Sequence, residues 1–368
     1  MDSTNHDEIL VYVGTYTQPE AHVLGKGEGI YCYRMNLASG ALTFDSVTTG
    51  PVNPSFLALD PRRRFLYAVS EVMAIDGQPG GAVYAYAIDA NTGRLTFLNR
   101  QPSQGAAPCY LSVEPMGRWV FAANYGGGTV AVFPIQDDGR LGPATSVAHH
   151  AGSSVNPERQ EAPHPHSILP DLAGRFVFAA DLGLDKIMIY RLDAAAGTVT
   201  PNDPPWVSMQ AGAGPRHLVF HPRDRYAYLM NELDATVTVF AYDAARGALT
   251  LVQTVETLPA AYAGLRHGAD VHAAPSGRFI YASNRGHDSL AVFAIDEATG
   301  RLTVVGHEPT QGKTPRNFAI DPTGTFLLAA NQDTDTIVTF RLDAQTGMPV
   351  PTGHVADVPT PVCITIMA

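Results

Sequence analysis

The sequence predicts an all-β fold, a seven-bladed β-propeller of four-stranded antiparallel blades, with residues 1–368 forming a single domain. Two recurring motifs support this prediction. The first is a glycine-containing turn between two apolar runs, as in residues 299–303 (Thr-Gly-Arg-Leu-Thr), which is typical of a β-hairpin. The second resembles residues 275–279 (Pro-Ser-Gly-Arg-Phe) and lies between a short apolar run and the next strand.

The turn motif occurs seven times, at intervals of about 50 residues, so the copies occupy nearly the whole chain. Four-stranded units of this length, with no helical periodicity between them, are typical of propeller blades. A β-solenoid is the alternative, but its repeats are usually shorter. The turn glycines of the seven copies are Gly40, Gly93, Gly139, Gly197, Gly247, Gly300 and Gly347.

The two ends of the chain match complementary parts of one repeat. The first copy begins at residues 9–13 without a leading strand, whereas the C-terminal residues 360–366 resemble the leading strand at 314–320. We therefore expect the C-terminal strand to complete the first blade, which removes exposed sheet edges. Residues 1–8 are polar and are expected to be a disordered tail.

Composition narrows the functional classes. The formal charge of −11 disfavours a nucleic-acid binder, which needs a basic face. No apolar run is long enough for a transmembrane helix, and from the polar N-terminal residues we expect no secretory signal. Three cysteines without a C-x-x-C pair indicate reduced thiols, so we expect a cytoplasmic protein. A closed ring can act alone, so we expect a monomer or weak homo-oligomer.

Propeller geometry predicts which side chains meet at one mouth of the central channel. The innermost strand of a blade begins, and its second strand ends, on the same face of the ring. The aligned residues that begin the innermost strands are Ser55, Cys109, His166, Arg216, Ala269, Arg316 and Val362. Those that follow the second strands are Tyr16, Glu71, Tyr125, Leu182, Glu232, Arg285 and Gln332.

These two sets place Arg216, Arg285 and Arg316 in one funnel of an acidic protein. Guanidinium groups bind carboxylate or phosphate in a bidentate manner, so the funnel is expected to take a small anionic ligand. Glu232 is a candidate general base, and His166 can exchange a proton near neutral pH. The alternative is that such Arg–Glu pairs only join neighbouring blades. The arginines argue against a metal, and no cofactor is implied.

Several separated motifs resemble the lactonase family of seven-bladed propellers, which includes bacterial 6-phosphogluconolactonases and the fungal carboxy-cis,cis-muconate cyclase. These motifs are residues 164–167 (His-Pro-His-Ser), 212–222, 228–233, 270–272 (Asp-Val-His) and 283–285 (Ser-Asn-Arg). The resemblance covers essentially the whole chain. It implies a catalytic set of His166, Arg216, Glu232 and Arg285. The expected substrate-binding residues are Arg316, Gln332, His164, Glu71, Tyr125 and His272.

The resemblance implies a carboxylic-ester hydrolase that opens an anionic sugar lactone, with 6-phosphogluconolactone as the expected substrate. Two arginines would hold the anion and polarise the carbonyl, while Glu232 or His166 activates water. One alternative is a cycloisomerase of the muconate type, in which the same arginines hold carboxylates while a lactone closes. A second alternative is a propeller that serves as a binding platform without chemistry.

Overall fold

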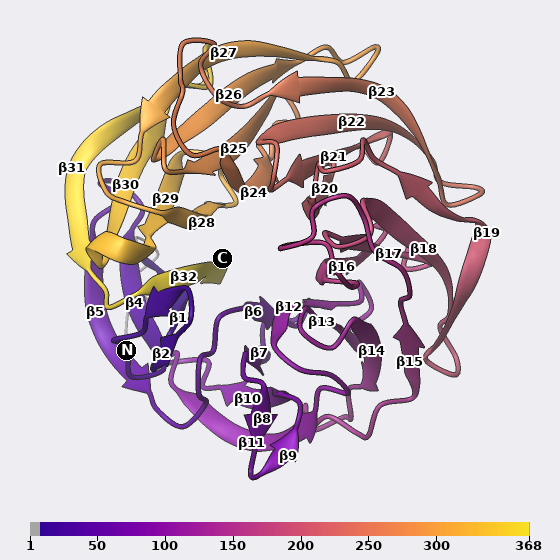
Figure 1. The fold of residues 1–368 in the computed structure, drawn as a ribbon. Helices are drawn as coiled ribbons and strands as arrows, with labels where there is room; N and C mark the ends of the chain where they lie inside the picture. The colour runs from indigo at the N-terminus through magenta and orange to yellow at the C-terminus, as the bar shows by residue number, and fades with distance from the viewer. Residues whose placement is uncertain (1–7, 368) are drawn as a thin grey trace.

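The computed structural model describes residues 8–367, which form seven four-stranded antiparallel sheets in a ring around a central channel (Figure 1). The predicted propeller fold is confirmed. In every blade, the strands follow one another from the channel outward. Within these residues, no helix is long and apolar enough to cross a membrane.

From the channel outward, blade 1 consists of β32 (Pro361–Met367), β1 (Glu8–Thr15), β4 (Ile30–Asn36) and β5 (Leu42–Thr48). Blade 2 consists of β6 (Leu57–Leu59), β7 (Phe65–Ser70), β10 (Ala82–Ile88) and β11 (Leu95–Pro102). Blade 3 consists of β12 (Pro108–Val113), β13 (Trp119–Asn124), β14 (Thr129–Pro134) and β15 (Ser146–His149). Blade 4 consists of β16 (Pro165–Pro170), β17 (Phe176–Asp181), β18 (Lys186–Asp193) and β19 (Thr198–Ser208).

In the same order, blade 5 consists of β20 (Pro215–Phe220), β21 (Tyr226–Asn231), β22 (Thr236–Asp243) and β23 (Ala248–Glu256). Blade 6 consists of β24 (His267–Ala273), β25 (Phe279–Arg285), β26 (Ser289–Ile295) and β27 (Leu302–Pro309). Blade 7 consists of β28 (Pro315–Ile320), β29 (Phe326–Asn331), β30 (Thr336–Leu342) and β31 (Pro349–Asp357). The remaining elements are the short hairpins β2 (Pro19–Glu20) with β3 (Val23–Leu24) and β8 (Ala74–Ile75) with β9 (Gln78–Pro79), and the 3₁₀ turn η1 (Gln332–Thr334).

The two ends of the chain close the ring in blade 1. The C-terminal strand β32 pairs antiparallel with β1, with Ile364 opposite Val13, as predicted. Figure 1 shows the yellow β32 beside the indigo β1. Glu8, which the sequence analysis included in the expected disordered tail, belongs to β1 and pairs with Asn36 of β4. Residues 1–7 lie outside the described part of the chain.

The hydrophobic core lies between the blades. Seven clusters of buried side chains among the described residues each join two neighbouring blades, as where Tyr12 of blade 1 packs with Leu66 and Tyr86 of blade 2. Alternate residues of a strand point to opposite faces, and both faces of a blade are covered in this ring. The second strands are therefore continuous buried runs, whereas the outermost strands are half-exposed.

The two recurring sequence motifs meet at these blade interfaces. Tyr281, in the second strand of blade 6, donates its hydroxyl hydrogen to the carbonyl oxygen of the turn residue Gly347 in blade 7 at 2.8 Å. Gly347 has φ +74°, and a Cβ there would lie 2.5 Å from the ring of Phe279. Tyr12 makes the same kind of hydrogen bond to Gly93 at 2.6 Å. The turn glycine thus serves both the hairpin and the contact with the preceding blade.

Candidate active site

The ends of the second strands and the starts of the innermost strands border one cavity of about 780 Å³ at one mouth of the channel. The structure brings seven of the ten predicted site residues to its wall. These are Glu71, Tyr125, His166, Glu232, Arg285, Arg316 and Gln332. Each belongs to one of the two sets of aligned blade positions, so the repeat explains why residues distant in sequence converge here.

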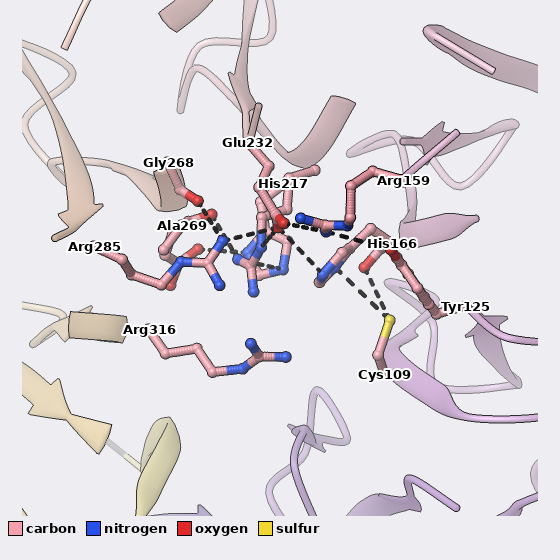
Figure 2. Close-up of polar contacts among 12 residues, drawn as sticks. Cys109, Tyr125, Arg159, His166, His217, Glu232, Gly268, Ala269, Arg285 and Arg316 are labelled. Carbon is pink, nitrogen blue, oxygen red and sulfur yellow. Dashed lines mark hydrogen bonds and ion pairs between the residues drawn. The ribbon is translucent and has the colours of Figure 1, made fainter. Parts of the chain in front are cut away.

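Glu232 is the centre of the polar contacts (Figure 2). Its Oε2 accepts from Nε of Arg216 at 3.0 Å and lies 2.9 Å from Nη2 of Arg285. Its Oε1 accepts from Nη2 of Arg159 at 2.6 Å. Three guanidinium groups therefore converge on one buried carboxylate.

These charges determine the protonation state of Glu232. Burial alone would raise the pKa of its carboxyl group, but Arg285, Arg216, His166 and Arg159 together hold that pKa well below its ordinary value. Glu232 is consequently an ionised group that orients arginines. Both of its oxygens already accept hydrogen bonds from guanidinium groups, which argues against its candidate role as general base.

His166 begins the innermost strand of blade 4 and is buried at the cavity wall. Its Nε2 lies 3.8 Å from Oε2 of Glu232, and its Nδ1 lies 3.7 Å from Sγ of Cys109. Burial, together with the positive charge of Arg216, holds the pKa of His166 well below its ordinary value. The imidazole is therefore neutral at neutral pH and has a free lone pair for a proton.

Arg159 is a site residue that the sequence analysis missed. It lies in residues 150–164, the longest connection in the described chain between an outermost strand and the next innermost strand. Besides Glu232, its Nη2 contacts the hydroxyl of Tyr125 at 3.4 Å. The length of this connection could have indicated a site residue in the sequence, because a long insertion at the mouth of a propeller packs over the channel.

Arg316 stands on another part of the wall, apart from the Glu232 contacts (Figure 2). Its Nη2 donates to the hydroxyl of Tyr16 at 3.1 Å, and its guanidinium lies over the Tyr16 ring. Among residues 8–367, it forms no ion pair with a carboxylate. Arg316 therefore presents to the cavity a positive charge that no direct ion pair within these residues neutralises.

Two predicted substrate-binding residues do not line the cavity. His164 stacks on Tyr125 with ring centroids 4.4 Å apart, and its Nδ1 contacts the Tyr125 carbonyl oxygen at 3.0 Å, so it supports Tyr125 from behind. His272 lies three residues along β24 from Ala269, about 10 Å deeper in the channel at 3.3 Å per residue. Its Nε2 contacts Asp270 at 2.9 Å.

Arg216 also does not line the cavity, because it lies behind Glu232 in a buried chain of polar contacts. Its Nη1 donates to the carbonyl oxygen of Ala269 at 2.6 Å and lies 3.2 Å from Nε2 of His217. Nδ1 of His217 lies 2.7 Å from Oδ1 of Asp270. The pKa of Asp270 is held well below its ordinary value by His272 and His217 against the effect of burial, so Asp270 is ionised. Nδ1 of His217 therefore carries the hydrogen, and its Nε2 accepts from Arg216.

The fold and the site define a class of protein, a seven-bladed propeller with an arginine-lined pocket at one mouth of its channel. The family model described as "Lactonase, 7-bladed beta-propeller" matches residues 10–366. The chain therefore belongs to the lactonase family of seven-bladed β-propellers, as the sequence motifs indicated.

Relatives in this family bear the names of lactonases. The chain is 38% identical to the 6-phosphogluconolactonase of Bacillus subtilis over 85% of both chains, and 33% identical to that of Serratia proteamaculans, again over 85% of both. Among solved structures, the periplasmic gluconolactonase of Pseudomonas aeruginosa superposes with a TM-score of 0.91 and is 36% identical, with 98% of this chain and 99% of that chain covered.

Proposed function

We propose that the protein is a lactonase that hydrolyses 6-phosphogluconolactone to 6-phosphogluconate. The observation that supports this most is the pocket itself, in which the guanidinium of Arg316, free of direct ion pairs among the described residues, shares one cavity with the neutral imidazole of His166. The names of the relatives supply the particular lactone, and the arginines supply the chemical reason why an anionic one would bind.

Two arginines bind the substrate. Arg316 holds the phosphate, because its Nε and Nη1 have no hydrogen-bond partner and its guanidinium forms no direct ion pair among the described residues. Arg285 lines the same cavity, with Nη2 held by Glu232 and the Gly268 carbonyl oxygen at 2.8 Å. Its Nη1 has no such partner within residues 8–367 and polarises the lactone carbonyl.

The reaction needs a base for water and a group for the oxyanion. His166 accepts the proton of the attacking water, and the Glu232 carboxylate 3.8 Å away stabilises the imidazolium that forms. Arg285 stabilises the tetrahedral oxyanion. Glu232 acts through the arginines, which it holds in place. The ring oxygen then takes up a proton as the C–O bond breaks, and no covalent intermediate is formed.

The test compares wild-type protein with His166→Asn on 6-phosphogluconolactone, free gluconolactone and carboxymuconate. We expect the wild type to open the phosphorylated lactone, and we expect His166→Asn to lower kcat by about 10²-fold or more. Turnover of carboxymuconate without lactone opening would instead establish the cycloisomerase alternative. Ligand binding without turnover of any of the three would make the propeller a binding platform.

We place this reaction in the cytoplasm, because a phosphorylated sugar does not cross a bilayer unaided. The three buried free thiols are consistent with a reducing compartment. A monomer or weak homo-oligomer stays our prediction for the oligomeric state. Size-exclusion chromatography with light scattering tests it, and a stable dimer at micromolar concentration would contradict it.

A further inference from the structure

Glu71 and Glu232 lie on opposite sides of the cavity. Glu71 directly follows β7 of blade 2, and Glu232 directly follows β21 of blade 5. Three blades is the largest separation that a ring of seven allows, and both side chains line the cavity. A lactone bound between them therefore has a carboxyl group on either side.

The two oxygens of Glu71 have different surroundings. Oε2 accepts the hydroxyl hydrogen of Tyr16 at 3.0 Å and that of Ser55. Oε1 has no hydrogen-bond partner among the described residues, and it is not one of their enclosed unpaired atoms, so it faces the cavity. Tyr16 and Ser55 thus fix the carboxyl group by one oxygen and leave the other free for a ligand.

The charges around Glu71 also differ from those around Glu232. Glu232 forms ion pairs with three arginines, whereas Glu71 forms none within residues 8–367. Burial raises the pKa of Glu71, although Arg316 and the hydrogen bonds from Ser55 and Tyr16 oppose this. The titratable and charged groups that face Glu71 are Tyr16, Cys109, Arg216 and Arg316.

Opening a sugar lactone releases an alkoxide, which is a strongly basic leaving group. Its departure is accelerated by a proton donor placed beside the ring oxygen. Glu232 is ionised and carries no proton, and neutral His166 takes up the proton of water. The imidazolium of His166 is held beside Glu232, so an acid on the opposite side of the cavity can serve a ring oxygen that points away from it. Two carboxyl groups whose pKa values are driven apart are a usual arrangement for such a division of roles.

We propose that Glu71 is the general acid of this site and donates the proton on Oε1 to the ring oxygen of the lactone. This inference rests on the proposed hydrolysis. Water loses one proton to His166 and forms the new C–O bond to the carbonyl carbon. The ring C–O bond breaks, its electron pair stays on the ring oxygen, and that oxygen takes the proton of Glu71. Solvent then returns the proton from His166 to Glu71.

The first experiment measures kcat against pH for the wild type and Glu71→Gln. The wild-type kcat should fall as pH rises through the pKa of Glu71, because only the protonated acid donates. Glu71→Gln should lower kcat by about 10²-fold or more, with KM nearly unchanged, and should lack this basic limb. Glu20→Gln is the matched control. Glu20 also lines the cavity, but its Oε1 accepts from Nδ2 of Asn53 at 2.7 Å. The Glu20→Gln variant should therefore keep the wild-type kcat and the fall of kcat at high pH.

Two further variants separate proton donation from a merely structural role. Ser55→Ala removes a hydrogen bond that lowers the pKa of Glu71, so the basic limb should move to higher pH. Glu71→Asp keeps an acid and should retain the limb with part of the activity. These two variants also serve if Glu71→Gln does not fold.

The outcomes are distinguishable. A Glu71→Gln enzyme within twofold of the wild-type kcat would overturn the inference, as would a basic limb that does not move in Ser55→Ala. In both cases the wild type still opens the lactone and the proposed function stands. If the wild type itself fails to open any lactone, the proposed function fails first.

Discussion

Nε of Arg216 lies 3.0 Å from Oε2 of Glu232, and their side chains are only 2% and 4% exposed. Two buried opposite charges stabilise each other only as a pair, because either one alone keeps its full desolvation penalty. The pair is therefore the framework of the site, and removing one partner would leave a buried charge without its counter-charge.

We expect Glu232→Gln to lower the free energy of unfolding by about 3–5 kcal/mol, because it leaves buried guanidinium groups without their counter-charge. Urea unfolding followed by circular dichroism measures this. Glu297→Gln is the control, since its pair with Arg223 is 59–60% exposed and its loss should cost at most about 1 kcal/mol. Equal effects of the two variants would contradict the account.

The pH dependence of this stabilisation has a definite sign. The folded-state pKa of Glu232 is depressed, so its contribution is fully present above the unfolded pKa of about 4.3 and is lost as pH falls through the lower folded value. The difference in unfolding free energy between the wild type and Glu232→Gln should thus be constant from about pH 5 to 8 and shrink below about pH 4. A difference that changed near pH 7 would show that Glu232 titrates there.

Arg316→Met should raise KM for 6-phosphogluconolactone by about 10- to 100-fold, since a charge-assisted hydrogen bond is worth roughly 1.5–3 kcal/mol. KM for free gluconolactone should change much less, because it lacks the phosphate. Steady-state kinetics on both lactones measures the contrast. Arg278→Met is the control, because Arg278 donates to the carbonyl oxygen of Ala344 and lies outside the cavity wall. The same KM change for both lactones would argue against phosphate binding by Arg316.

Asp270 does not line the cavity, but Asp270→Asn should still lower kcat by about 10-fold or more. The ionised Asp270 fixes the hydrogen of His217 on Nδ1, and an amide does not enforce that tautomer, so Arg216 and Glu232 lose their alignment. His272→Gln, which alters a different contact of Asp270, should have a smaller effect on kcat. If both variants keep the wild-type kcat, the chain from Asp270 to Glu232 has no part in positioning.

The repeat made Glu232, Arg285 and Arg316 predictable, because each occupies a blade position whose place at the channel mouth follows from the fold. The pairing of these residues was not predictable. Whether Arg216 faces substrate or lies behind Glu232 depends on side-chain packing against Ala269 and His217, which repeat alignment does not describe.

Two other outcomes show where the repeat stops being informative. Arg159 comes from a connection outside the repeat, and its position depends on how residues 150–164 fold over the mouth. His272 was assigned from a motif, but three residues along a strand are enough to move a side chain out of the pocket. Whether a side chain lines the pocket therefore depends on its position within the strand as much as on its blade.

The most direct test of the central claim follows the consumption of 6-phosphogluconolactone by phosphorus NMR, with purified wild-type protein and with His166→Asn. We expect the wild type to accelerate opening far above the spontaneous rate and His166→Asn to lose about 10²-fold or more of that acceleration. Opening at the spontaneous rate with folded wild-type protein, or undiminished opening by His166→Asn, would contradict this claim.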